Sequence, residues 1–283
     1  SEPGRRYGTI EMLKRAAAAA LDQVSFGPRD IEILIHAGVY RDQFLSEPAL
    51  ATILAGEMKF NSTPEAAFER KTFAFDLLSG GAGFLNACYV AQQLIHARNV
   101  AKAMVVTSEV ENNAALDPHN LFGLQETAAA VVLERDVSGS EGFQSFFFRY
   151  YLGFLSAFET HGALRNGRAY LSIVRSGEWQ AAALESVLDA VGCYLDSENT
   201  TLDKIDWILP PQISTPFIKD LALRLEVDSG KVIDATRGGP NLFTASFPYA
   251  LMEARRRGAT SGDLGLVIDV GSGIQVAAAL YAF

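Results

Sequence analysis

The first part of the chain alternates between two hydrophobic periods. Apolar residues spaced three and four apart predict amphipathic helices, and short continuous apolar runs predict buried strands. Within residues 1–140 this pattern predicts helices at 8–25, 50–56 and 83–98, and strands at 30–40, 71–77, 101–110 and 127–135.

The same order returns in residues 141–283. We expect helices at 178–195, 215–225 and 244–258, and strands at 204–212, 231–234, 263–273 and 274–283. Alternating helices and strands predict a mainly parallel sheet covered on both faces. Two similar halves, 1–140 and 141–283, joined near 135–142, indicate an internal duplication. The ligand site is then expected where strand ends from both halves converge.

Composition narrows the possible functions. The 283 residues are 49% hydrophobic with a net charge of −9, which is typical of a soluble globular protein and argues against nucleic-acid binding. No set of residues has metal-ligand spacing and no phosphate loop is present, so we expect neither metal nor cofactor. The two cysteines, Cys88 and Cys193, lie among apolar residues and are predicted to be buried free thiols, which favours a reducing, cytoplasmic location.

Two further segments bear on location and assembly. The N-terminus lacks an apolar signal region, and the aromatic run at 143–158 is shorter than the ~20 residues of a membrane span and contains Arg149, so we expect no membrane association. That run is predicted to form core and subunit interface, with an acyl tunnel as the alternative. The "RRRG" stretch at 255–258 predicts a solvated helix end or, alternatively, contact with an acidic partner.

The stretch "FDLLSGGAGFLNA", 75–87, carries the candidate chemistry. A predicted strand ends at Asp76, a glycine-rich bend follows, and an apolar helix begins. Such turns present reactive groups at helix N-termini, where the helix dipole favours an anion. No cysteine stands in the bend, and its one hydroxyl belongs to Ser79, a weak nucleophile without a neighbouring base. His161 is the best outside candidate for such a base.

Three ordered motifs carry a resemblance to a known family. "AFDLLSGGAGFLNACYVAQQLI" resembles the nucleophile turn of β-ketoacyl-ACP synthase III, in the thiolase superfamily. "IDWILPPQIS" is similar to the strand that carries the family's catalytic histidine, and 238–283 resembles the C-terminus with its catalytic asparagine and glycine-rich loop. The resemblance implies a duplicated α/β/α/β/α fold, a dimer, and condensation of an acyl thioester with malonyl-ACP.

Carried over by position, the family's site has lost two catalytic groups. The cysteine position is Gly81, or Ala82 after a one-residue shift, and the histidine position is Pro211. Asn241 matches the catalytic asparagine, so Asn241 is the retained catalytic candidate. The resemblance also implies a substrate-binding surface formed by the residues at these motifs: Gly81, Ala82, Pro211, Gln212, Ser246 and Ser272.

The resemblance leaves alternatives open. This chain starts at or just before the family's first helix, so the central strand of the first sheet is expected to be absent or replaced. One hypothesis is a non-catalytic accessory subunit that pairs with an active ketosynthase III-like partner in acyl-chain, polyketide or secondary-metabolite biosynthesis. The other is a condensing enzyme or acyltransferase that acts on CoA or ACP thioesters through Asn241, as a homodimer. A third is a variant whose natural sequence carries cysteine at 81 or 82.

Overall fold

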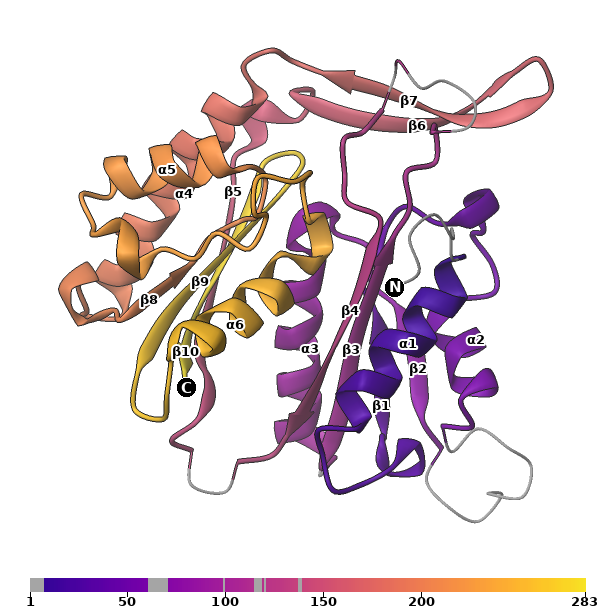
Figure 1. Ribbon diagram of the computed structural model, residues 1–283, viewed down its shortest axis with the longest axis horizontal. Helices are drawn as coiled ribbons and strands as arrows, with labels where there is room; N and C mark the ends of the chain where they lie inside the picture. Colours follow the sequence, from indigo (N-terminus) through magenta and orange to yellow (C-terminus); the bar gives the residue numbers. More distant parts are fainter. Residues whose placement is uncertain (1–7, 61–70, 99, 115–118, 120, 137–138) are drawn as a thin grey trace.

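The computed structural model describes residues 8–283 except 61–70, 99, 115–118, 120 and 137–138. Two four-stranded sheets stand side by side with helices between and outside them, and a long hairpin lies across one end (Figure 1). No helix in these described ranges is long and apolar enough to cross a membrane.

The first sheet is built from the N-terminal half, in the order β2-β1-β3-β4. β1 pairs in parallel with both β2 and β3, and β4 is antiparallel to β3. The elements are α1 (Thr9–Leu21), β1 (Ile33–His36), α2 (Leu50–Glu57), β2 (Phe73–Asp76), α3 (Gly83–Arg98), β3 (Lys102–Glu109) and β4 (Thr127–Glu134).

The second sheet has the order β5-β10-β9-β8. β8 is parallel to β9, whereas β10 is antiparallel to both β9 and β5. The elements are β5 (Gly142–Tyr150), β6 (Phe158–Arg165), β7 (Arg168–Arg175), α4 (Trp179–Ser197), β8 (Trp207–Leu209), α5 (Thr215–Arg224), α6 (Ser246–Arg257), β9 (Leu264–Gly271) and β10 (Gln275–Ala282).

The layers follow from which helix faces are apolar. α1 and α2 cover the outer face of the first sheet, and α4 covers the outer face of the second, with α5 packed against it. α3 and α6 lie between the sheets and contact both of them (Figure 1). The predicted duplicated five-layer α/β/α/β/α architecture is therefore confirmed. The boundary at 140/141 falls between β4 and β5, and we keep it as the division between the halves.

Three sequence predictions need correction. The sheets are mixed rather than mainly parallel. The strand expected at 231–234 is reduced to one bridge between Ile208 and Val232, because the segment 229–231 forms a 3₁₀ turn that the Asp228 side chain caps. The β6–β7 hairpin was missed, although its Asn166-Gly167 turn, with φ of 52° and 75°, is a recognisable hairpin signal.

The expected gap at the centre of the first sheet does not exist, because β1 pairs directly with β3. Comparison of the halves places the difference at an edge. β4 corresponds to β10, and β10 has β5 on its outer side, whereas β4 has no counterpart of β5 among the described strands. Among the described strands, the first half thus lacks an edge strand and not the central one.

The aromatic run is mainly a sheet strand. Phe147 stacks on Tyr194 of α4, while Phe146 and Phe148 pack around Tyr89 of α3. Phe158, at the end of the run, lines the cavity described below. Both cysteines are free; Cys88 is buried as predicted, and Cys193 is half-buried and accepts a hydrogen bond from Arg149.

Candidate functional site

The turn before α3 has no room for a side chain at its centre. β2 ends at Asp76, and a 3₁₀ turn, Gly80–Ala82, leads into α3. Gly80 has a φ of +56°, which suits glycine. A Cβ added to Gly81 would lie 2.5 Å from the carbonyl oxygen of Val270 on β9, well inside van der Waals contact. The turn is therefore closed by the backbone of the other half.

The turn before α6 keeps its polar side chains. Here a 3₁₀ turn, Phe243–Ala245, leads into α6. Asn241 Oδ1 accepts a hydrogen bond from Phe243 N at 2.7 Å, and the Asn241 backbone pairs with residues 123–125. Ser246 Oγ donates to Phe243 O at 2.6 Å and accepts from Gln212 N at 3.1 Å. Among the described residues, Asn241 Nδ2 has no hydrogen-bond acceptor.

A cavity of about 120 Å³ lies between the two turns. Its wall includes Gly81, Pro211, Asn241, Ser246 and Ser272, so the structure brings together most of the positions that the sequence singled out. The rest of the wall is largely aromatic, with Phe122, Phe158, Trp179 and Phe243 as its main members. This is the mostly apolar, sparsely polar composition expected of a small-molecule site.

Three sequence-predicted residues lie outside the cavity wall. Ser79 Oγ donates to Gln275 Oε1 at 2.7 Å and accepts from Asn86 Nδ2 at 2.8 Å. Gln212 is fully buried, and its side chain donates to two backbone carbonyls and accepts from Ala235 N. Ala82 is also fully buried. The contacts of Ser79 and Gln212 tie neighbouring loops together.

His161 also lies outside the cavity wall. It lies on β6 with 60% of its side chain exposed, and its Nε2 pairs with Glu159 at 2.9 Å. None of the histidines in the described ranges contributes to the cavity wall.

A buried network below β2 holds the turn in place. Asp76 accepts hydrogen bonds from the N–H groups of Leu50 and Ala51 at the start of α2, and Arg41 Nη1 lies 2.8 Å from its Oδ2. Burial opposes ionisation of Asp76, but the neighbouring His36 ring, 3.6 Å from its Oδ1, and hydrogen bonds from the backbone bring its pKa to about 2. Burial itself lowers the pKa of His36. These groups stabilise the fold and do not reach the cavity.

Two wall residues were missed at the sequence level. Asp269 is 1% exposed, and burial raises its pKa well above the usual value. Trp179, at the start of α4, has a buried Nε1 that finds no hydrogen-bond partner among the described residues. A signal for Asp269 was present, since an acidic residue inside the apolar run "LGLVIDVG" is unusual for a buried strand. No feature of the sequence pointed to Trp179.

Comparisons with known proteins agree with this geometry. Two family profiles match the chain and together cover more than half of it: "3-Oxoacyl-[acyl-carrier-protein (ACP)] synthase III" at residues 75–150, and the C-terminal domain of the same synthase at 195–283.

Curated relatives extend the match over nearly the whole chain. β-Ketoacyl-[acyl-carrier-protein] synthase III of Vesicomyosocius okutanii is 29% identical over 284 residues, covering 97% of this chain and 84% of that protein. The synthase of Cereibacter sphaeroides is 27% identical, covering 94% and 81%.

Solved structures share the fold. The 3-oxoacyl-[acyl-carrier-protein] synthase III of Aquifex aeolicus superposes with a TM-score of 0.82 at 21% identity, covering 99% of this chain and 86% of that one. OleA of Xanthomonas campestris gives a TM-score of 0.83 at 18% identity, covering 99% and 84%.

Proposed function

Because the chain belongs to the 3-oxoacyl-[acyl-carrier-protein] synthase III family, we propose that it is a non-catalytic, accessory member that pairs with an active ketosynthase III-like subunit. The pathway would be acyl-chain, polyketide or secondary-metabolite synthesis, in the cytoplasm. In this role the chain supplies a second subunit surface and an acyl-sized cavity, while its partner supplies the nucleophile.

The observation that carries this proposal is the closed turn at Gly81. Family chemistry needs a thiolate at the start of α3, but an added Cβ would stand 2.5 Å from Val270 O. The histidine position is Pro211, which has neither a donor nor a base. Loss of a nucleophile and its base removes several powers of ten in rate. Both replaced positions line the same cavity. This supports a protein that has kept the family's fold but not its covalent catalysis.

An edge of the first sheet offers a surface for pairing. β2 pairs with β1 on one side and with no described strand on the other. Phe73, the first residue of β2, and Leu78, two residues after the strand, are large apolar residues with 59% and 60% of their surface exposed. An open strand edge beside exposed apolar side chains is typical of a protein interface.

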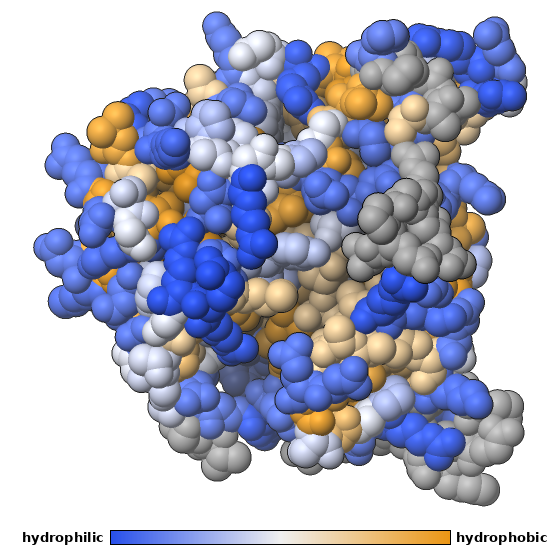
Figure 2. Space-filling model, viewed as in Figure 1, coloured by the Kyte–Doolittle hydropathy of each residue, from blue (hydrophilic) through white to orange (hydrophobic). Residues whose placement is uncertain are grey.

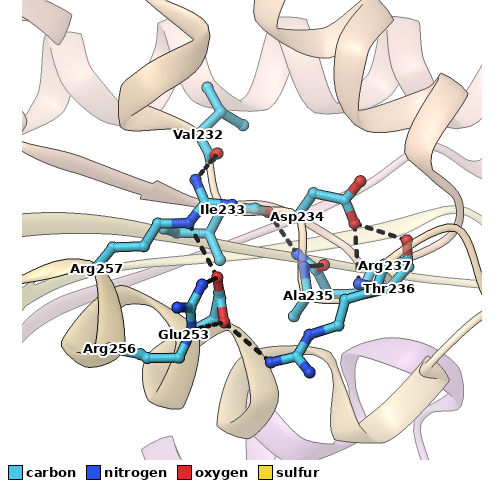
Figure 3. Close-up of polar contacts among 10 residues, drawn as sticks. Val232, Ile233, Asp234, Ala235, Thr236, Arg237, Glu253, Arg256 and Arg257 are labelled. Atoms are coloured by element: carbon cyan, nitrogen blue, oxygen red, sulfur yellow. Dashed lines mark hydrogen bonds and ion pairs between the residues drawn. The ribbon is translucent and has the colours of Figure 1, made fainter.

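The basic end of α6 is a docking surface for an acidic carrier. Figure 3 shows the carboxylate of Glu253 ringed by Arg237, Arg256 and Arg257, so one negative charge faces three positive ones. Hydrophilic side chains gather over α6 in the space-filling view (Figure 2). A surplus of arginine suits acyl carrier protein if that protein is acidic, which supports the partner expected from the family.

The first experiment tests catalysis. The purified chain is incubated with acyl-CoA and malonyl-ACP, and the products and the intact protein are measured by mass spectrometry. We expect no condensation product and no acyl adduct on the protein. A stable homodimer that turns over these substrates would refute the accessory role.

The second experiment tests pairing. A cysteine-bearing ketosynthase III-like protein is co-expressed with this chain, and the assembly mass is measured by light scattering. Phe73→Asp places a charge on the proposed interface and should weaken the heterodimer by about 2 kcal/mol or more. Leu223→Asp is the matched control, because Leu223 is 75% exposed on α5, away from β2. Equal loss in both variants would count against this surface.

A second function remains in view because Asn241 Nδ2 has no acceptor among the described residues and Asn241 lines the cavity. In that case the chain is itself a condensing enzyme or acyltransferase that works on CoA or ACP thioesters without an acyl-enzyme. Asn241 would donate to the oxygen that becomes negative in the transition state. Any turnover should then fall about a hundredfold in Asn241→Ala; equal rates would exclude this mechanism.

A further inference from the structure

The outer edge of β4 lies in an apolar groove. Because Arg135 N donates to Ala101 O, the register turns the N–H groups of Ala128, Ala130 and Val132 away from β3, and none of them has a hydrogen-bond partner among the described residues. Figure 2 shows a hollow with apolar side chains between α6 and α1, where Figure 1 places β4. A row of unpaired backbone groups in such a groove is a template for one more strand.

The second half shows what fills the equivalent place. β4 and β10 are each antiparallel to the preceding strand of their sheet, β3 and β9. The fourth residue of α3, Asn86, donates to Gln275 at the start of β10. In the same way the fourth residue of α6, Tyr249, is hydrogen-bonded to Thr127 at the start of β4. Since β5 runs antiparallel along the outer side of β10, a strand that fits the outer side of β4 runs antiparallel to β4.

The side chains that β5 covers in the second half are left open in the first. The first six residues of β10 are buried, whereas residues 130–133 of β4 are half-buried. Tyr89, the seventh residue of α3, is packed by Phe146 and Phe148 of β5. The seventh residue of α6 is Met252, which is 68% exposed. An apolar surface that two bulky side chains cover in the second half is therefore uncovered in the first.

The register of β5 specifies the side chains that such a strand needs. Two phenylalanines of β5 lie opposite Ala277 and Ala279 of β10. Counted from the first residue of each strand, the equivalent positions of β4 are Ala129 and Val131. A complementary strand carries bulky apolar side chains opposite these two residues, where they cover Met252, and no proline where its N–H groups face β4.

The geometry favours a separate extended segment as the occupant. Every described strand of this chain already has a place in one of the two sheets or in the β6–β7 hairpin. The sheet edge of a second copy would bring its own covering helices against α1 and α6, which stand on both sides of β4 (Figure 1). β2, the proposed pairing surface, lies at the opposite edge of the first sheet, so a strand on β4 does not compete with a subunit there.

We propose that the edge of β4 is a docking site for an extended segment of a second polypeptide, which adds to the first sheet antiparallel to β4 and places bulky apolar side chains over Met252. In strand addition of this kind, main-chain hydrogen bonds give affinity and alternate side chains give specificity. The site goes beyond the proposed function, because it depends neither on the cavity nor on the subunit at β2.

The test uses a strand-forming peptide as the probe. Its sequence is "GFQSFFFRY", the chain's own residues 142–150, with blocked ends and a lysine tail for solubility. Amide exchange in the full chain is measured residue by residue by NMR, with and without the peptide. Bound peptide should slow exchange at Ala128, Ala130 and Val132 at least about tenfold and leave the amides of β2 unchanged.

A matched peptide separates strand pairing from general stickiness. In β5 the N–H of Phe147 faces Ala278 of β10, so a peptide with Phe147→Pro loses a donor to the neighbouring strand and keeps its length and charge. Its affinity, measured by calorimetry, should be at least about tenfold lower.

Variants of the protein locate the peptide. Met252→Asp replaces the exposed apolar surface by a charge and should weaken peptide binding about tenfold. Leu223→Asp, at a position that is 75% exposed on α5, is the matched control and should leave binding unchanged. Thermal melting shows whether each variant is folded, and the two peptides keep the test intact if one is not.

Several outcomes would overturn the proposal. They are no binding of "GFQSFFFRY", equal affinity of the two peptides, equal binding by the two protein variants, or binding that leaves the amides of β4 unprotected. Slow exchange of Ala130 and Val132 without peptide would also overturn it. Protection that rises with protein concentration would assign the edge to a second copy, and protection independent of concentration would assign it to the chain itself. None of these outcomes bears on the accessory role, which rests on the turn at Gly81.

Discussion

The two turns that start α3 and α6 occupy equivalent places in the two halves but are filled in opposite ways. The middle residue of the first turn is Gly81, and that of the second is Thr244. Thr244 is fully buried and donates from Oγ1 to Glu109 Oε1 at 2.6 Å, reaching from the second half into the first. At Gly81 the carbonyl of Val270 takes the space a side chain would need. The halves thus interlock by a side chain at one turn and by backbone at the other.

The sheets differ in a related way. β10 is paired along its length on both sides, by β9 and β5. β4 is paired by β3 on one side, and no described strand pairs with its other side. The second half therefore has a fully bonded strand where the first half has an edge.

The largest expected effect is in hydrogen exchange along these two strands. Arg135 N donates to Ala101 O, so the register directs the N–H groups of 129, 131 and 133 toward β3 and those of 128, 130 and 132 outward. The outward amides should open with several kcal/mol less free energy than those of β10.

Exchange measured residue by residue by NMR checks this expectation. An alternating pattern on β4 and uniform protection on β10 would support the difference between the strands. Protection of Ala130 and Val132 equal to that of Ala278 would mean that the edge is covered.

The second-largest expected effect concerns the turn at Gly81. Gly81→Cys places a thiol at the position proposed for the family's nucleophile but forces its Cβ against Val270 O, so the free energy of unfolding should fall by about 3 kcal/mol, and no acyl adduct should form. Denaturation and intact mass measure both outcomes. Gly192→Ala, within α4 and with open space around it, is the control and should stabilise by about 1 kcal/mol. A stable, acylated cysteine variant would show that the turn is not closed.

The turn before α6 is tested by the substitution Thr244→Val. Removing the hydroxyl leaves Glu109 without one of its donors and should cost about 2 kcal/mol. Burial raises the pKa of Glu109 to about 7, so the folded state binds this proton more tightly than the unfolded chain does. Stability should therefore fall as pH rises from about 4.5 to about 7, and in the variant the decline should extend to higher pH.

Denaturation across this pH range measures both effects. Thr260→Val, at an exposed position, is the control and should change stability by less than about 0.5 kcal/mol. A pH profile that is identical in wild type and Thr244→Val would contradict the assigned role of Thr244.

The sequence predicted the layered fold and most of the cavity wall because both depend on local patterns. Apolar periodicity located α3 and β3, and short motifs located Gly81, Pro211 and Asn241. What escaped prediction depends on contacts between distant segments. The steric closure of Gly81 arises from Val270, and the burial of Asp269 and Trp179 arises from how β9 and α4 pack against the rest of the core. Neither property is encoded in spacing along one element.

The position of the edge strand also could not be predicted from local sequence patterns. The sequence suggested a gap in the first sheet, but strand order is a long-range property, and the gap was assigned to the centre instead of the edge beside β4. The β6–β7 hairpin was lost for a different reason: only its first residue, Phe158, belongs to the aromatic run at 143–158, and the residues around the Asn166-Gly167 turn were assigned to no element.

The smallest expected effect concerns the basic end of α6. Glu253 is buried and lies 2.6 Å from Arg256, 3.1 Å from Arg257 and 3.4 Å from Arg237 (Figure 3). Hydrogen bonds from Arg256, followed by those from the other arginines, lower its pKa to about 2. Because Arg237 and Arg256 are 74% and 66% exposed, water and salt screen these pairs, and Glu253→Gln should cost about 1 kcal/mol.

The sign of the pH dependence follows from the lowered pKa. The stabilisation is present above the unfolded-state pKa of about 4.5 and is lost as pH falls toward 2, so wild type and Glu253→Gln should converge in acid. Denaturation at low and high salt, from acid to neutral pH, measures this. Glu185→Gln, which breaks an exposed pair with Arg224, is the matched control and should have almost no effect. A difference between wild type and Glu253→Gln that persists near pH 2 would mean that Glu253 acts through packing. The positions of the arginines would then be set by the end of α6 and not by attraction to the Glu253 carboxylate.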